Sequence, residues 1–423
     1  MTSEVVIMNR RAIALAADSA VTVTVVQNGR RESKYFKGAN KVFELSHHSP
    51  VALMIFNMAD VHSVPWELII KSYRDHLGKR SFPTLDEYAK DLFSYIENHS
   101  HLFPPARQEE LFKLDAVSAA FDLLDWIEKD KRVAAETDPV KKDAARATVL
   151  SEIANDLATE PLPPHFPATS IADAVAKFGN DLDTALTSLL TSSGIGITPK
   201  TLVDVVVEAI YKRYPRFLNH TGIVIAGYAE DDYFPGFVQY NCYGILLGKF
   251  IADRDKARSV TVDNGSHIQP FAMNDMVHTF MSGMSPDIFS VVLQGFDDSL
   301  KALAQHVQTE LGVPAIPNLD IHSQDCLKKF QDRLIDAQVT EHYKPLTRAV
   351  NSLPVDEMAS LAETLIMLES LKEKVTRPSE SVGGPVDVAV ITKGEGLVWI
   401  KRKHYFPAEL NGRFLERQRQ RFG

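Results

Sequence analysis

The stretch TSEVVIMNRRAIALAADS (residues 2–19) contains two short apolar runs separated by the polar residues Asn9, Arg10 and Arg11. The runs cover residues 4–8 and 12–19. Apolar runs of this length on either side of a polar turn are typical of two strands joined as a hairpin with a buried face. The sequence therefore predicts that the chain begins with antiparallel β structure.

The rest of the chain groups its strands and helices into blocks. Further strands are expected at 21–26, 41–45, 51–56, 221–230, 236–244, 245–252, 258–264, 385–393 and 396–406, with a polar loop at 27–40. Residues 83–214 are predicted to form mostly amphipathic helices, and more helices are expected at 60–78, 272–282, 286–311, 323–340 and 354–375. A doubly wound parallel sheet would show single strands that alternate with helices. Here several strands follow one another before the next helices, which favours an α+β fold of stacked antiparallel sheets.

Composition limits the classes of partner. The chain has 423 residues and a formal charge of −9, which argues against nucleic acid as a partner. The basic C-terminal tail (residues 411–423) is local, and we expect it to be a solvated or interface surface. No apolar run reaches the roughly 20 residues that cross a bilayer, so no membrane association is expected.

Cysteine and histidine spacing gives no sign of a metal or cofactor. Cys242 and Cys326 are far apart and lie in no CxxC or Cys/His pattern, which argues against a disulfide framework or zinc site and fits a reducing compartment. The histidine pairs, His47–His48 and His99/His101, lack the helical spacing of a chelating site. These spacings lead us to expect neither a cofactor nor a metal. Because no secretory signal pattern opens the chain, we expect a cytoplasmic protein.

Thr2 follows the initiator methionine directly. A threonine hydroxyl is a weak nucleophile unless a base takes its proton, and an N-terminal threonine carries such a base in its own α-amino group, with a pKa near 7.7–8. If Met1 is removed, Thr2 becomes residue one. The sequence thus permits nucleophilic catalysis by Thr2.

The residues after Thr2 resemble the proteasome β-subunit and bacterial proteasome-like peptidases, which are N-terminal-nucleophile (Ntn) hydrolases. In that family a threonine begins the first strand, an aspartate sixteen residues later ends the second, and a lysine begins a later strand. The corresponding residues are Thr2, Asp18 in Ala-Ala-Asp-Ser (16–19) and Lys41 in KVFEL. Three further segments also resemble the family: MADVHSVPWELIIKSYR (58–74), GIVIAGYAEDDYFPGFVQYNCYG (222–244) and SVGGPVDVAVITKGEGLVWI (381–400).

The resemblance implies a four-layer αββα sandwich of two antiparallel sheets. It assigns residues 1–80 and 221–410 to this Ntn-hydrolase domain, and leaves 81–220 as a large helical insertion without a counterpart. It also implies a homo-oligomeric ring that admits polypeptide or other amide substrates. The insertion is expected to gate the chamber, to replace an α-type ring, or to dock an unfoldase or other regulatory partner.

The resemblance assigns roles to the central residues. Lys41 is expected to lower the pKa of the Thr2 hydroxyl and to keep the Thr2 amine neutral, and Asp18 to pair with Lys41 and orient it. An ordinary ion pair at strand ends is the alternative for Asp18 and Lys41. The oxyanion donor is expected near Phe56-Asn57, where Asn57 offers a backbone N–H and a side-chain amide.

Three positions depart from the family. Phe56 and Asn57 replace a glycine pair, and the bulk of Phe56 is expected to narrow the cleft. Before Gly383-Gly384, Glu380 is the candidate for the family's acid, with Ser379 as the alternative, and Val382 takes the place of its serine. The serine that supports the amine has no clear match, and Ser266, Asn274 and Asp275 are nearby candidates.

The leading hypothesis is a threonine-type Ntn hydrolase that cleaves peptide or amide bonds, with Thr2, Asp18, Lys41, Asn57 and Glu380 in its active site. Two alternatives stay open. One is a proteasome-like ring or scaffold subunit that has lost activity. The other is a small-molecule Ntn amidohydrolase in which the helical insertion forms a lid.

Overall fold

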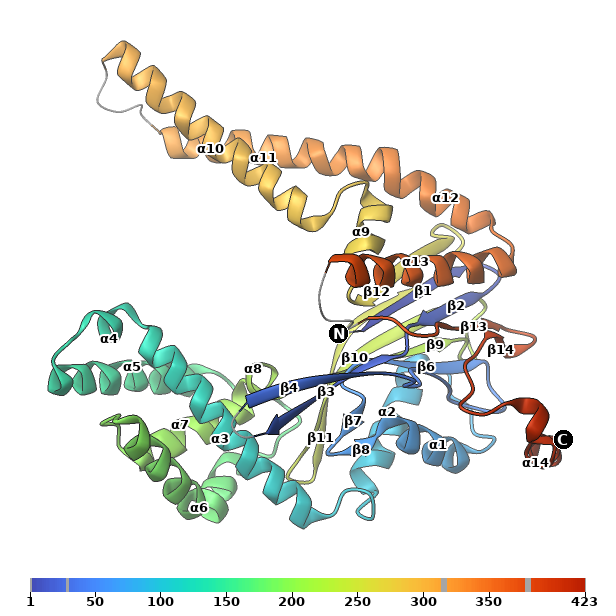
Figure 1. Ribbon diagram of the computed structural model, residues 1–423, viewed down its shortest axis with the longest axis horizontal. Coiled ribbons are helices and arrows are strands. Elements are labelled where there is room, and N and C mark those ends of the chain that lie inside the picture. The colour runs from blue at the N-terminus through green and yellow to red at the C-terminus, as the bar shows by residue number, and fades with distance from the viewer. Residues whose placement is uncertain (1, 28–29, 313–317, 377–381, 423) are drawn as a thin grey trace.

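The computed structural model describes residues 2–27, 30–312, 318–376 and 382–422, and its main strands form two five-stranded antiparallel sheets (Figure 1). The first sheet has the order β12-β1-β2-β13-β14, with the strands β1 (Ser3–Asn9), β2 (Ile13–Ala17), β12 (Ser266–Ala272), β13 (Asp387–Thr392) and β14 (Gly396–Lys401). The second has the order β11-β10-β9-β6-β5, with β5 (Val42–Glu44), β6 (Val51–Asn57), β9 (Thr221–Gly227), β10 (Gly236–Leu246) and β11 (Lys249–Ser259). The expected α+β class with antiparallel sheets is therefore confirmed.

The N-terminal hairpin forms the middle of the first sheet. β1 and β2 pair with Glu4 opposite Ala17 and Met8 opposite Ile13. Asn9 holds their turn, because its Oδ1 accepts the Arg11 N–H at 2.9 Å and its amide donates to Val350 O at 3.0 Å. The turn is thereby tied to the helices that cover this sheet.

The two sheets pack face to face through side chains that alternate along their strands. Val6 and Met8 of β1 point into the core between the sheets, together with Met54 of β6 and Val224 of β9. Val5 and Ile7 of β1 point the other way, toward the helices on the outside. The even-numbered residues of β1 therefore face the second sheet.

Helices cover both outer faces. The second sheet packs against α1 (Trp66–Leu77) and α2 (Leu85–Asn98), and the small strands β7 (Asp60–Val61) and β8 (Val64–Pro65) lead into α1. The first sheet packs against α9 (Asp275–Ser282), α12 (Lys344–Ser352) and α13 (Val355–Thr376). In Figure 1, α13 crosses β1 and β2 on the side opposite α1 and α2.

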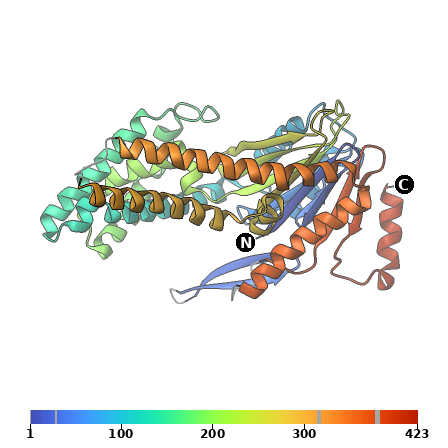
Figure 2. The same ribbon diagram turned by 90° about the horizontal axis from the view of Figure 1, so that it is seen from above.

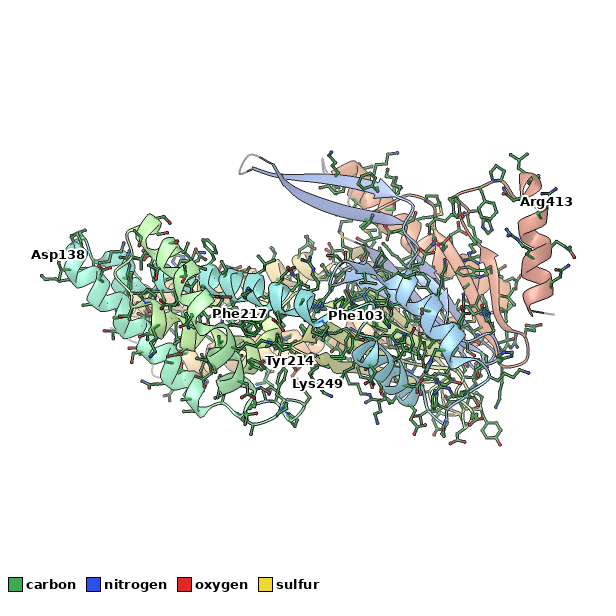
Figure 3. The ribbon with its side chains drawn as sticks, turned by 90° about the horizontal axis from the view of Figure 1, so that it is seen from below. Phe103, Asp138, Tyr214, Phe217, Lys249 and Arg413 are labelled. Carbon is green, nitrogen blue, oxygen red and sulfur yellow. The ribbon has the colours of Figure 1, made fainter. Side chains whose placement is uncertain are left out.

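The helices α3 to α8 form a separate bundle with its own core. They are α3 (Pro105–Lys129), α4 (Lys131–Ala135), α5 (Pro139–Thr159), α6 (Ser170–Ser193), α7 (Pro199–Lys212) and α8 (Tyr214–Phe217). Leu246 and Ile251, at the β10–β11 turn, belong to the same core. Figure 3 shows the junction, where Tyr214 and Phe217 lie between the bundle and the sheets, and the Tyr214 hydroxyl donates to Asp253 at 2.7 Å.

Two hairpins project from this body, one of strands (Figure 2) and one of helices (Figure 1). The first consists of β3 (Ala20–Gln27) and β4 (Arg30–Lys37), so the loop expected at 27–40 is wrong for most of its length. Its backbone continues the ladder from Ala20↔Lys37 to Gln27↔Arg30, a pairing that the polar side chains of this segment concealed. The second is helical, with α10 (Pro286–Leu311), α11 (Leu319–Gln338) and a π-helical turn (Val339–Tyr343) that leads into α12.

The chain ends with a 3₁₀ turn (Ala408–Leu410) and α14 (Gly412–Phe422), which contains most of the basic tail. Among the residues that the structure describes, no helix is both long enough and apolar enough to span a bilayer.

Candidate active site

Thr2, Asp18 and Lys41 meet where the two sheets end together. Thr2 directly precedes β1 and Asp18 directly follows β2, so the antiparallel hairpin places them side by side. Lys41 directly precedes β5 of the second sheet. All three are nearly inaccessible, with exposures of 6%, 0% and 4%. The structure thus brings together the three residues that the resemblance selected.

Asp18 is held by four donors. Its Oδ1 accepts the Ser3 N–H at 3.1 Å and pairs with the Lys41 ammonium, and its Oδ2 accepts the N–H groups of Ala20 at 3.2 Å and Gly383 at 2.9 Å. These bonds satisfy both oxygens of a fully buried carboxylate, which offsets its desolvation. Asp18 therefore has a fixed orientation and in turn fixes the ammonium of Lys41.

Gly383 and Gly384 allow the chain to approach Asp18 closely. Their φ angles are 144° and 83°, which side chains rarely adopt, and a Cβ on Gly384 would lie 2.7 Å from Ser19 Oγ. Val382, next to them, is buried. Glu380, the candidate acid, lies outside the described residues.

Asn57 provides a backbone donor beside the nucleophile. Its N–H points to Thr2 Oγ1 at 3.5 Å, and its φ of 67° lies in the left-handed region, which asparagine tolerates better than most residues. This conformation explains how Asn57 replaces glycine. Its side-chain amide lies 3.0 Å from Nε2 of His220, the residue before β9, so the amide contacts His220 and not Thr2.

Phe56 does not narrow the cleft, and that expectation is wrong. The ring is buried between the sheets, where its centroid lies 5.5 Å from that of Phe271. A Cβ on Gly222 would lie 2.0 Å from the Phe56 ring, so Gly222 leaves the space that the ring fills. The alternation of β6 turns Phe56 inward while Asn57 stays exposed at the strand end.

Of the three candidates for the residue that supports the Thr2 amine, one lies far from Thr2 and two lie near it. Ser266 pairs with Asn9 at the far end of β12, and its hydroxyl donates to Thr347 O at 2.6 Å, so it is remote from Thr2. Asp275 and Asn274 lie near the Thr2 end, because the neighbouring Met273 N–H donates to Thr2 O at 2.9 Å. Asp275 itself pairs with Lys372 at 3.2 Å.

Glu4 is a site residue that the sequence analysis missed. It is completely buried, and its Oε1 lies 3.3 Å from Lys41 Nζ. Burial raises the pKa of Glu4 to about 8; the Asp18 charge contributes in the same direction, while Lys41 and the Thr2 hydroxyl oppose the shift. The missed signal was alternation, because Thr2 and Glu4 are two residues apart on one strand and so share a face.

A pocket of about 190 Å³ begins one residue from the Asn57 donor. Met58 and His220 line it, together with Asp60, His62 and Asp115. Asp115 comes from α3, so the helical bundle supplies one wall.

The charges of this pocket are set by burial. Burial, assisted by the nearby Arg107 cation, lowers the pKa of His62 to about 4, and burial also lowers the pKa of His220. Burial raises the pKa of Asp115 to about 6. At pH 7 both histidines are therefore neutral, and the carboxylate of Asp115 brings negative charge to the pocket.

No group of three or more His, Cys, Asp or Glu side chains suited to a metal ion occurs in the described part of the chain. The known protein families include none whose model matches this sequence, and no curated protein matches it significantly.

Proposed function

We propose that the protein is a threonine-type Ntn hydrolase that cleaves peptide or other amide bonds with Thr2 as its nucleophile. The observation that carries this proposal is the buried Thr2–Asp18–Lys41 cluster with the Asn57 N–H at Thr2 Oγ1. The paired sheets and their outer helices, read as an αββα Ntn-hydrolase sandwich, support it.

The geometry suits acyl transfer. Removal of Met1, which lies outside the described residues, leaves Thr2 as the first residue, and its Oγ1 attacks the substrate carbonyl. The Asn57 N–H is placed to donate to the oxyanion that forms, while Lys41, oriented by Asp18, supplies a positive charge beside the nucleophile. Water then releases the acyl group from Thr2.

The other parts of the proposal follow from the resemblance. We place the enzyme in the cytoplasm, in a homo-oligomeric ring that acts on polypeptides and works with an unfoldase or regulatory partner. The structure shows Cys242 and Cys326 as free thiols, which fits a reducing compartment. A monomer or dimer in solution would instead favour the small-molecule amidohydrolase with a helical lid.

The intact mass of the purified protein after treatment with a peptide epoxyketone or β-lactone tests the nucleophile. We expect loss of one methionine and a single adduct, which peptide mapping places on Thr2. Thr2→Ala should give no adduct, and Thr191→Ala, which changes an exposed threonine of α6, should react like the wild type. A chain that keeps Met1 and forms no adduct would contradict the proposal and favour the inactive scaffold.

A further inference from the structure

Glu4 faces the same space as the nucleophile. Residues Val6 and Met8 of β1 point between the sheets, and by alternation Thr2 and Glu4 do so as well, at the end where Lys41 and Asn57 enter from the second sheet. Opposite Glu4 on the neighbouring strands are only Ala17 and Phe271. No polar group of these two partners competes for its carboxyl.

The two carboxyl groups beside Lys41 differ in their hydrogen bonds. Asp18 accepts four hydrogen bonds, whereas neither oxygen of Glu4 has a partner with hydrogen-bond geometry among the described residues. The Lys41 ammonium is 3.3 Å away, and the Thr2 hydroxyl is near enough to influence the carboxyl. A fully buried acid with one cationic neighbour and no hydrogen bond of good geometry costs stability, and a group kept at such a cost is a candidate for function.

The groups that face Glu4 favour proton exchange near neutral pH. They are the Lys41 ammonium, the Asp18 carboxylate and the Thr2 hydroxyl. Burial and Asp18 raise the pKa of Glu4 to about 8 against the effect of Lys41 and Thr2. A carboxylate with such a pKa is a stronger base than an ordinary one, and a general base works best when its pKa is near the working pH.

We propose that Glu4, rather than the Thr2 α-amine, is the general base that takes the proton of the Thr2 hydroxyl. This inference rests on the proposed hydrolase function. As Oγ1 forms its bond to the substrate carbonyl carbon, its proton passes to the Glu4 carboxylate. Glu4 then gives that proton to the leaving nitrogen when the C–N bond breaks. In deacylation Glu4 takes a proton from the attacking water and returns it to Oγ1.

The rate of Thr2 acylation by the same β-lactone, measured from pH 6 to 9.5, tests this role. Removing a general base typically costs 10²–10⁴-fold, so we expect Glu4→Gln to react at least about 100-fold more slowly while still losing Met1. Asp253→Asn changes a partly buried carboxyl at the junction with the bundle, and should react like the wild type.

Rescue by small acids separates a base from a structural counter-ion of Lys41. In Glu4→Ala, formate and acetate should restore acylation, with a rate that rises with the pKa of the added acid. Where Glu4→Ala does not fold, Glu4→Asp replaces it, and its pH–rate midpoint should move while acylation persists.

Four results bear against the inference. Glu4→Gln that is acylated at the wild-type rate would leave the α-amine as the base and the hydrolase proposal intact. A folded Glu4→Ala that small acids do not rescue, or a Glu4→Asp whose midpoint equals that of the wild type, would reduce Glu4 to a counter-ion. A wild-type protein that forms no Thr2 adduct would overturn both proposals.

Discussion

Asn57 adopts a left-handed backbone conformation beside the candidate nucleophile. Its φ of 67° aims the N–H at Thr2 Oγ1, a task for which glycine pays no steric penalty and asparagine a small one. The sequence analysis identified Asn57 as a donor from the resemblance, but it could not show the left-handed backbone. It also assigned the bulk of the neighbouring Phe56 to the wrong side of the strand.

Substitutions at Asn57 should separate the backbone from the side chain. Asn57→Gly and Asn57→Ala both remove the contact with His220, but only alanine is strained in the left-handed region, by about 1–2 kcal/mol. We expect Asn57→Ala to lower the unfolding free energy and the Thr2 acylation rate, and Asn57→Gly to keep acylation close to the wild type. Urea unfolding and intact-mass kinetics measure both. Equal loss in the two variants would show that the side chain matters.

The site residues differ in how far sequence could predict them. Thr2 and Asp18 follow from one hairpin, since antiparallel pairing of adjacent strands brings their ends together. Lys41 needed the family resemblance, because it enters from another sheet. Glu4 was hidden within an apolar run although alternation placed it beside Thr2, and His220, far along the chain, had no local signal that pointed to Asn57.

At the scale of elements, periodicity predicted helices better than it predicted their partners. An amphipathic pattern shows that one face of a helix is buried but not what covers it. Within residues 81–220, α2 packs on the second sheet, whereas α3 to α8 pack on one another and on Leu246 and Ile251. The same limit hid the pocket, because it forms only where α3 meets the ends of β9 and β10.

The α3 wall of this pocket predicts a substrate preference. Asp115 has no hydrogen bond or ion pair among the described residues, and its carboxylate brings negative charge to the pocket at pH 7, while His62 and His220 are neutral. We expect peptides with arginine or lysine beside the scissile bond to be cleaved faster than those with leucine or glutamate. Asp115→Asn should reduce this ratio by up to about tenfold, the equivalent of 1.4 kcal/mol.

The pH dependence and a second variant on α3 check the origin of that preference. Because the pKa of Asp115 is about 6, the preference for basic residues should weaken as pH falls through 6. Asp122→Asn, which changes an exposed aspartate seven residues further along α3, should leave the ratio unchanged. A ratio of kcat/KM values that is the same in the wild type and Asp115→Asn would show that the pocket does not select charge.

At the scale of the whole molecule, the stacking of two sheets creates the site and also buries its charges. Thr2, Glu4 and Asp18 come from the first sheet, and Lys41 and Asn57 from the second, so the cluster exists only when both are packed together. The global stability should therefore depend on the protonation of Glu4, whose oxygens accept no hydrogen bond of good geometry from the described residues.

That dependence has a definite sign. Because the folded-state pKa of Glu4, about 8, is above its ordinary value of 4.5, the folded state binds more protons than the unfolded state between these pH values. The contribution of Glu4 to stability is fully present below pH 4.5, declines as pH rises, and is lost above pH 8, with a slope of at most about 1.4 kcal/mol per pH unit. Glutamine at position 4 cannot ionise. The unfolding free energy of Glu4→Gln should therefore increase relative to that of the wild type as pH rises from 5 to 9. Urea unfolding at several pH values measures the difference, with Thr191→Ala, which changes no titratable group, as the control whose curve should stay parallel to the wild type. A constant difference between Glu4→Gln and the wild type would mean that Glu4 is ionised throughout this range, in which case the Lys41 ammonium outweighs its burial.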